Sequence, residues 1–101
     1  MDNEDAPVAM DRLMSLLDRV AVVTGAAQGI GFAIACRLAE ARASVVVVDV
    51  DGVKAADAAS EIADRYDARA LSYAADISRE ADVDRLDEFV HREFGPVHIW
   101  I

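Results

Sequence analysis

Short runs of β-branched residues alternate along the chain with segments whose apolar residues recur at helical spacing. Val20 to Val23 and Ser44 to Val50 are two such runs, and each predicts a buried parallel strand. Helical spacing begins after them, from Ile30 and again over Val53 to Tyr66, which is rich in alanine. A third short strand is predicted over Ala70 to Ala74.

The last helix is predicted over Ser78 to Phe94, with apolar residues on one face and acidic residues mainly on the other. Gly95 and Pro96 end it, and a fourth strand begins after them. The order β-α-β-α-β-α-β fits right-handed parallel crossovers. We therefore predict an α/β fold with a Rossmann-like doubly wound parallel sheet, incomplete because such sheets normally have about six strands or more. The fourth strand should lie beside the first and leave an open edge.

Three glycines lie between the first strand and the first helix, in the segment Thr24-Gly25-Ala26-Ala27-Gln28-Gly29-Ile30-Gly31. A helix that begins there offers unpaired N–H groups and the positive end of its dipole to an anion. Gly25 would allow a tight turn, Gly29 a close approach of the backbone to pyrophosphate, and Gly31 close packing of helix against strand. The segment predicts a dinucleotide site, and a plain βα turn is the alternative.

An acidic residue, Asp49, stands at the carboxyl end of the second strand, roughly 20 residues past the glycines. Its carboxylate is expected to accept hydrogen bonds from the hydroxyls of an adenosine ribose. The same charge would repel a 2′-phosphate, and Gln28 offers no positive charge to pair with one. Both residues favour NAD over NADP, whereas the alternative for Asp49 is an ordinary turn residue at a strand end.

These features resemble the classical short-chain dehydrogenases/reductases. The resemblance rests on Val-Ala-Val-Val-Thr-Gly-Ala-Ala-Gln-Gly-Ile-Gly at residues 20–31, whose Gly-x-x-x-Gly-x-Gly spacing is that family's variant. It continues through Arg37 to Ala41, Asp49 and Ala75 to Ser78, and it ends with residues 94–101. The match therefore covers about residue 16 to the last residue.

The resemblance implies a set of cofactor-binding residues: Gly25, Gln28, Gly29, Ile30, Gly31, Asp49, Asp76 and Ile77. The first five would lie along the pyrophosphate and Asp49 on the adenosine ribose. Asp76 would contact the adenine amino group, and Ile77 would lie beside the ring. The plainer role for Asp76 is a turn or helix cap. Ser78 is an alternative cap, with Glu80 and Asp82 favouring the positive end of the following helix.

The family's reaction is hydride transfer between an alcohol or ketone and nicotinamide, with a tyrosine as acid/base whose pKa a lysine lowers. The family's catalytic serine and Tyr-x-x-x-Lys pair have no counterpart here. Ala70 and Ile77 stand four residues beyond Tyr66 and Tyr73, where the motif needs lysine. We expect no catalytic residues in this chain, which reads as the NAD(H)-binding portion of such an enzyme, truncated before the reaction centre.

Two other functions stay open at this point. A short protein that binds a nucleotide without catalysis, or joins another chain through its open sheet edge, would have the same sequence features. A methyltransferase-type Rossmann domain also holds a ribose with an acidic residue after its second strand. The Gly-x-x-x-Gly-x-Gly spacing argues against that class.

Composition narrows the classes of partner. The formal net charge of −9 disfavours nucleic acids and anionic membrane surfaces, because phosphate contacts need clustered Lys and Arg. No apolar run reaches the roughly 18 residues that span a bilayer, and no secretory signal opens the chain, so we expect a cytoplasmic protein. Cys36, the only cysteine, is expected to be buried, and His91 and His98 lack companion ligands for a metal.

The ends of the chain add further expectations. Residues 1–12 predict a disordered acidic tail ahead of a single dinucleotide-binding domain over residues 13–101, with Met10 and Met14 as alternative starts. The open sheet edge and an uncovered sheet face predict marginal stability and self-association. Arg42 stands where the family usually has glycine, at a cost of about 1 kcal/mol if the backbone there is left-handed. His98 stands where the family frequently has aspartate.

Overall fold

The structure is a computed structural model, and it describes residues 16–101. The predicted tail and the alternative starts Met10 and Met14 lie outside this range. Within it the element order is the predicted one. The elements are β1 (Val20–Thr24), α2 (Gly29–Glu40), β2 (Ser44–Asp49), α3 (Gly52–Tyr66), β3 (Ala70–Ala74), α4 (Glu80–Phe94) and β4 (Ile99–Trp100).

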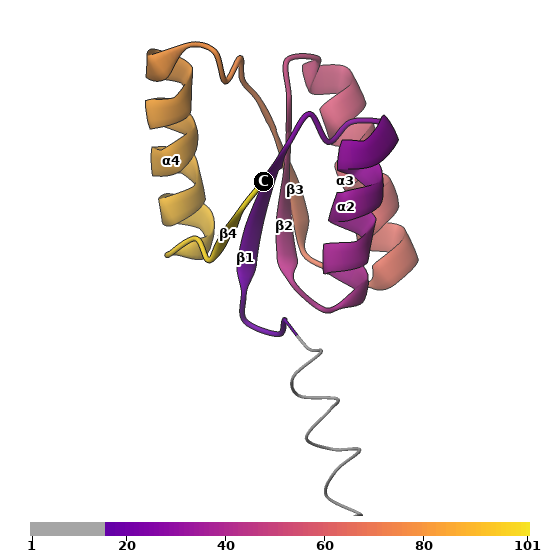
Figure 1. The fold of residues 1–101 in the computed structure, drawn as a ribbon. Helices are drawn as coiled ribbons and strands as arrows, with labels where there is room; N and C mark the ends of the chain where they lie inside the picture. Colours follow the sequence, from indigo (N-terminus) through magenta and orange to yellow (C-terminus); the bar gives the residue numbers. More distant parts are fainter. Residues whose placement is uncertain (1–15) are drawn as a thin grey trace, which may run out of the picture.

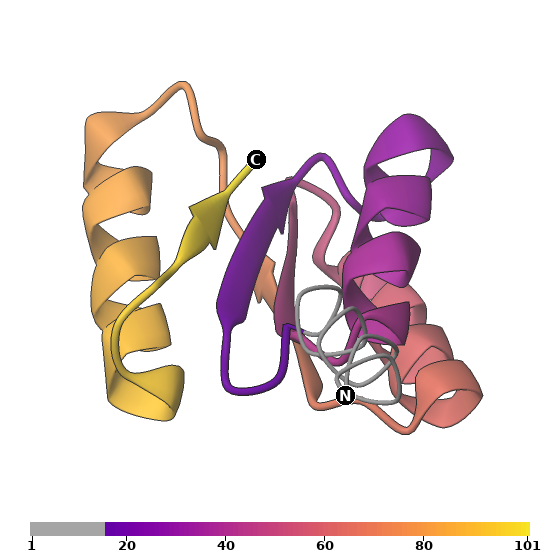
Figure 2. The same cartoon turned by 60° about the horizontal axis from the view of Figure 1, so that its bottom comes forward.

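The strands of the described residues form one parallel sheet in the order β3-β2-β1-β4. β1 pairs with β2 over its whole length, with Val22 opposite Val46. β4 pairs with the other side of β1, with Ala21 opposite Ile99. Helices α2 and α3 cover one face of the sheet and α4 covers the other (Figure 1 and Figure 2). The predicted doubly wound α/β fold, with the fourth strand beside the first, is confirmed.

Each face of the sheet has its own apolar core, because successive residues of a strand point to opposite faces. Val47 packs on the α2–α3 side together with Ile62. Val22 and Val46 pack on the other side with Leu86 of α4, and all five side chains are buried. The expectation of an uncovered sheet face is therefore wrong for β1 and β2, since the single helix α4 already covers it.

Large exposed apolar side chains occur at several places among the described residues, two of them on or directly after β4. Trp100 and Ile101 are 48% and 47% exposed, on the edge strand β4 and directly after it. The same strand end is tied to β1, because the carbonyl oxygen of Ile101 accepts hydrogen bonds from the Thr24 N–H and hydroxyl, each at 2.9 Å. The open edge of the sheet is thus the short strand β4, which is hydrogen-bonded to β1 and exposes the side chain of Trp100.

Helix α2 is followed by a left-handed residue at the position where the family usually has glycine. Arg42 has a φ of +81°. Its N–H donates to the Ala39 carbonyl at 2.9 Å, and the Ala43 N–H donates to the Leu38 carbonyl at 3.0 Å. These two bonds form a Schellman motif, in which glycine is the usual left-handed residue. The condition under which Arg42 costs stability is therefore met.

The start of α4 differs from the prediction. The helix begins at Glu80 rather than Ser78, and Arg79 is its N-cap without a side-chain capping bond. Ser78 is not the cap, because its hydroxyl donates to Oδ1 of Asp76 at 2.6 Å. This short-range bond competes with helix formation and accounts for the later start of α4.

Two single residues also have a structural account. Cys36 is buried, as predicted. Nδ1 of the His98 ring accepts a hydrogen bond from the Val20 N–H at 3.0 Å, and the backbone N–H of His98 donates to the Val20 carbonyl at 2.9 Å. The side chain of His98 therefore serves as a hydrogen-bond acceptor at the start of β1.

Candidate functional site

The glycines between β1 and α2 are needed for two different physical reasons. Gly25 and Gly29 have φ of +61° and +65°, and a Cβ at either would meet nothing within 4 Å. Gly31 has the opposite problem. An added Cβ there would lie 2.8 Å from the carbonyl carbon of Gly25 and closer still to its oxygen. Gly31 thus allows close packing, as predicted, although its contact is with the turn and not with β1.

The turn is held against the carboxyl end of β2. The N–H of Ala26 donates to the Val48 carbonyl at 3.1 Å, and the N–H of Ala27 donates to Oδ2 of Asp49 at 3.3 Å. The other carboxylate oxygen of Asp49 accepts the Asp51 N–H at 3.1 Å. Asp49 therefore lies beside the glycine turn.

A second carboxylate follows the next strand. The Ala75 N–H donates to the Asp49 carbonyl at 3.0 Å, which extends the β2–β3 ladder and brings Asp76 next to Asp49 along the sheet edge. Oδ1 of Asp76 accepts both the hydroxyl and the N–H of Ser78. The Ser78 hydroxyl, followed by the Ser78 N–H, lowers the pKa of the Asp76 carboxyl. Asp76 is thus held as an ionised acceptor in a turn.

The first turn of α4 supports this loop. Oδ2 of Asp82 accepts the Asp76 N–H at 2.9 Å, and Oδ1 accepts a bond from Arg85 at 3.3 Å. The bond from Asp76 is the main cause that lowers the pKa of Asp82. Sequence reasoning gave Asp82 only a helix-dipole role. An acidic residue in the first helical turn was the available signal, but its partner lies six residues back.

A pocket of about 180 Å³ lies where the glycine turn and the ends of β2 and β3 meet. Its lining consists of Gly25, Val48, Asp49, Val50, Ala75, Asp76 and Ile77. Val50 and Ile77 are exposed apolar side chains, and the two carboxylates are acceptors for hydroxyl and amino donors. This combination suits a flat ring joined to a sugar. Val50 was missed, although an apolar residue directly after Asp49 was the signal for it.

A second hollow of about 380 Å³ is lined by other residues of the same turn and by α3. Gln28 and Gly29 lie in it, together with Lys54, Asp57 and Glu61. Its side chains therefore carry one positive and two negative charges. Gln28 and Gly29 are thus separated from Gly25, Asp49, Asp76 and Ile77, which share the first pocket.

Two of the predicted residues line neither hollow. Ile30 is exposed in the first turn of α2, and Gly31 packs against the turn. Both belong to the helix start, where free backbone N–H groups are expected. Their position next to Gly29 keeps the glycine segment and the first turn of α2 together as one possible anion-binding unit.

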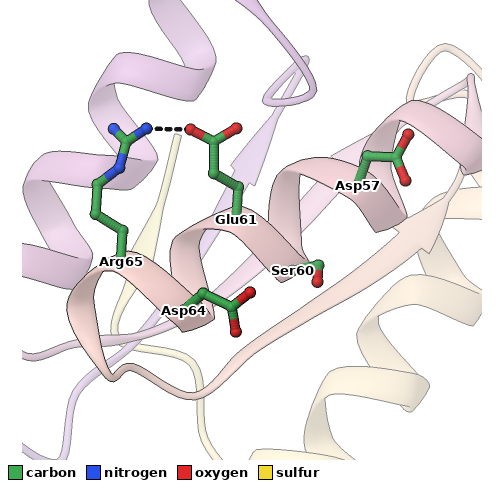
Figure 3. Close-up of a pocket in the computed structure, with 5 residues that line it drawn as sticks. All are labelled: Asp57, Ser60, Glu61, Asp64 and Arg65. Atoms are coloured by element: carbon green, nitrogen blue, oxygen red, sulfur yellow. Dashed lines mark hydrogen bonds and ion pairs between the residues drawn. The ribbon is translucent and has the colours of Figure 1, made fainter.

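A third hollow, of about 490 Å³, lies on the outer surface of α3 (Figure 3). It is lined by Asp57, Ser60, Glu61, Asp64 and Arg65, which all come from this one helix. Arg65 and Glu61 form an ion pair there, with both side chains half-exposed. A single solvated helix face supplies no opposing wall for a ligand, so this hollow is no candidate site.

The described residues bring no tyrosine and lysine together. Lys54 lies in the first turn of α3 and Tyr66 at its last residue. Tyr73 is on β3, and its ring packs against Phe89 of α4 with centroids 4.8 Å apart. In the same part of the chain, no group of His, Cys, Asp and Glu side chains is arranged to hold a metal ion. None of the helices described there is long and apolar enough to cross a membrane.

A parallel sheet with a glycine turn, a helix N-terminus and two carboxylates at strand ends defines a dinucleotide-binding class of fold. Comparison with known protein families identifies which family of this class the chain belongs to. The short chain dehydrogenase family matches residues 19–101, and the chain belongs to this family. That membership sets aside the methyltransferase-type alternative.

Individual relatives agree with the family. The chain is 40% identical over 86 residues to a 1-deoxy-11-beta-hydroxypentalenate dehydrogenase of Streptomyces avermitilis, a match covering 85% of this chain and 32% of the relative. The L-sorbose reductase of Gluconobacter frateurii, solved with NADPH and L-sorbose, has 33% identity and a TM-score of 0.83 over 86% of this chain and 33% of its own. The chain thus spans about a third of the length of these relatives.

A more distant solved structure shares the fold. A putative D-mannonate oxidoreductase from Haemophilus influenza, solved with bound NAD, has 20% identity and a TM-score of 0.80 over 90% of this chain and 32% of its own. Structural neighbours of this chain therefore contain NADPH in one case and NAD in another. Family membership therefore implies a nicotinamide dinucleotide, but it does not distinguish NAD from NADP, which differ by the phosphate on the 2′-oxygen of the adenosine ribose.

Proposed function

We propose that this chain binds NAD(H) and forms the cofactor-binding portion of an oxidoreductase that transfers hydride between an alcohol or ketone and nicotinamide. One observation carries the proposal. The pocket at the sheet edge joins Gly25 of the glycine turn to the carboxylates of Asp49 and Asp76. Family membership indicates the class of reaction, and the pocket indicates that these residues would bind the adenosine end of the dinucleotide.

In this proposal the dinucleotide lies across the carboxyl ends of the strands. The pyrophosphate lies on the glycine segment and the first turn of α2, at Gly25, Gln28, Gly29, Ile30 and Gly31. There the helix dipole and free N–H groups attract an anion. The adenosine enters the pocket, with its ribose hydroxyls donating to Asp49. Its adenine amino group donates to Asp76, beside Ile77. Bound in this way, the cofactor would supply the hydride chemistry.

The preference for NAD over NADP rests on charge. The carboxylate of Asp49 lies at the expected ribose, that of Asp51 is two residues further on at the N-cap of α3, and Gln28 is neutral. Lys54 is the only basic side chain in the hollow beyond Gln28, where Asp57 and Glu61 outnumber it. A 2′-phosphate would enter a negative field with one cation, and like charges at this range repel.

Titration with the reduced cofactors tests both parts of the proposal. We expect NADH to bind at least about tenfold more tightly than NADPH, which corresponds to about 1.4 kcal/mol. Asp49→Asn should narrow this preference because it removes the charge nearest the ribose. Asp64→Asn, on the outer face of α3, is a control that removes one charge from a distant surface. Absence of NADH binding would overturn the proposal, whereas equal affinities would overturn only the preference.

Nucleotide binding without catalysis is the second candidate function. Lys54 and Tyr66 lie at opposite ends of α3, about 18 Å apart along the helix axis at 1.5 Å per residue, so they cannot form the family's acid/base pair. A panel of alcohols with NAD, and of ketones with NADH, followed by nicotinamide absorbance, distinguishes the candidates. Turnover by these residues alone would contradict binding without catalysis.

Three expectations from the composition stay predictions. They are a cytoplasmic location, weak interaction with nucleic acids and weak interaction with anionic membranes. The net charge of −9 supports the second and third, since it repels polyanions.

A further inference from the structure

We propose that Asp82 is a positioning residue for the adenine end of the site, a role that rests on the proposed binding of NAD(H). Asp82 belongs to α4 and does not line the pocket itself. Its carboxylate reaches back to the loop that does, where Oδ2 accepts the Asp76 N–H at 2.9 Å. The Asp82 side chain is 26% exposed, so this bond is partly shielded from water.

The bond matters because of where β3 ends. The sheet ladder fixes the backbone as far as Ala75, whose N–H donates to the Asp49 carbonyl at 3.0 Å. Asp76 comes next, and its N–H turns away from β2 to the Asp82 carboxylate. Asp76 is therefore held between two points, the sheet on one side and the first turn of α4 on the other.

The side chain of Asp76 is oriented by the same loop. Oδ1 accepts the Ser78 hydroxyl at 2.6 Å and the Ser78 N–H at 3.0 Å. Oδ2 lies 3.8 Å from Nε of Arg79, in an exposed pair. Such a long, solvated contact yields easily to a better donor, so Oδ2 is the oxygen available to an adenine amino group. Asp82 acts on this contact only through the position of the Asp76 backbone.

A purely structural role for Asp82 is the competing explanation. A carboxylate in the first turn of a helix stabilises the helix through its dipole, whatever the loop does. Overall binding would fall with the fold in that case, regardless of which base the dinucleotide carries. If Asp82 is a positioning residue, its loss instead changes the ratio of affinities for dinucleotides that carry different bases. The two explanations therefore predict different results.

The experiment compares two ligands, NADH and reduced nicotinamide hypoxanthine dinucleotide, in which an oxygen replaces the adenine amino group. For the wild-type chain we expect NADH to bind about tenfold more tightly, the size expected for one hydrogen bond to a charged group. Asp82→Ala should reduce this preference to about twofold or less. Asp82→Asn should keep it, because the amide oxygen still accepts the Asp76 N–H.

Asp84→Ala is the matched control, since it removes one exposed carboxylate from the same helix and should leave the preference unchanged. An unchanged preference in Asp82→Ala, with both ligands weakened equally, would overturn the positioning role. If that variant does not fold by circular dichroism, Asp82→Glu takes its place under the same criterion, because it moves the acceptor by one methylene. Equal wild-type binding of both ligands would overturn this inference alone, and binding of neither would also overturn the proposed function.

Discussion

Gly31 shows most directly how a single hydrogen atom in place of a side chain shapes the candidate site. The helix start and the turn before it approach so closely that a Cβ at Gly31 would overlap the backbone of Gly25 and touch Cα of Ala26 at 3.0 Å. Backbone atoms cannot rotate away as a flexible side chain can. The glycine is therefore needed for packing, whether or not a ligand is bound.

We predict that Gly31→Ala lowers the free energy of unfolding by about 2–3 kcal/mol, as overpacking against fixed atoms does. Gly25→Ala is the matched comparison, because its Cβ meets open space and only the positive φ is strained. It should cost about 1 kcal/mol. Urea unfolding followed by circular dichroism measures both. Equal losses, or a larger loss for Gly25→Ala, would show that the close approach at Gly31 is not the dominant constraint.

The position of Asp49 could be predicted from the sequence because it depends on neighbouring strands alone. A carboxylate at the end of a buried strand must lie at the sheet edge where the glycine turn also lies. Asp82 could not be given its role in this way. Its partner is the Asp76 N–H, which lies outside α4 in a loop whose path the helical pattern does not describe. The pattern carries no information about a loop that side-chain bonds hold open.

Arg42, which follows α2, has a left-handed backbone conformation that is unfavourable for a residue with a Cβ. We predict that Arg42→Gly raises the free energy of unfolding by about 1 kcal/mol, since glycine adopts a positive φ without a Cβ penalty. Asp67→Gly at the end of α3 is the control. Asp67 also has a positive φ, of +52°, but aspartate tolerates this region better than arginine. Thermal and urea unfolding compare the two variants, and a neutral or destabilising Arg42→Gly would contradict the argument.

The junction of β3 and α4 should respond to acid. Hydrogen bonds from the loop lower the pKa values of Asp76 and Asp82 below their ordinary 3.8. A carboxyl whose pKa is lower in the folded state adds stability above its unfolded pKa and loses it as pH falls through the folded value. We therefore predict that the wild type is more stable than Asp82→Asn at about pH 6, and that this difference shrinks below about pH 4.

Urea unfolding across that range, with Asp84→Asn as the control, measures the difference. Asp84 is exposed on the same helix, so its variant removes a similar charge without removing the bond to Asp76. Its stability relative to the wild type should change less with pH. A constant difference for Asp82→Asn between pH 3 and pH 6 would show that the bond does not depend on the ionised carboxylate.

At the scale of the whole molecule, two forces oppose each other. The sheet edge exposes Trp100 and Ile101 beside a short strand, which favours pairing between chains. The net charge of −9 repels a second copy over distances that salt shortens, from about 10 Å at 0.1 M to about 3 Å at 1 M. Coverage of the central sheet by α4 removes the larger apolar face that the sequence suggested. Of the exposed apolar side chains that remain, Trp100 and Ile101 are the two on or next to the edge strand β4, so we expect this edge to drive association.

We predict that the chain is mainly monomeric at low salt and associates as salt rises, because screening removes the repulsion and leaves the apolar contact. Trp100→Ser should weaken this association, and sedimentation velocity at several concentrations would detect the change. Val53→Ser is the control, since Val53 is more exposed than Trp100, at 74% against 48%, but lies on α3 and not on β4. A sharp unfolding transition that is independent of concentration and salt, with monomers throughout, would show that β4 is a protected edge. Association that Val53→Ser weakens as much as Trp100→Ser would instead place the contact outside the sheet edge.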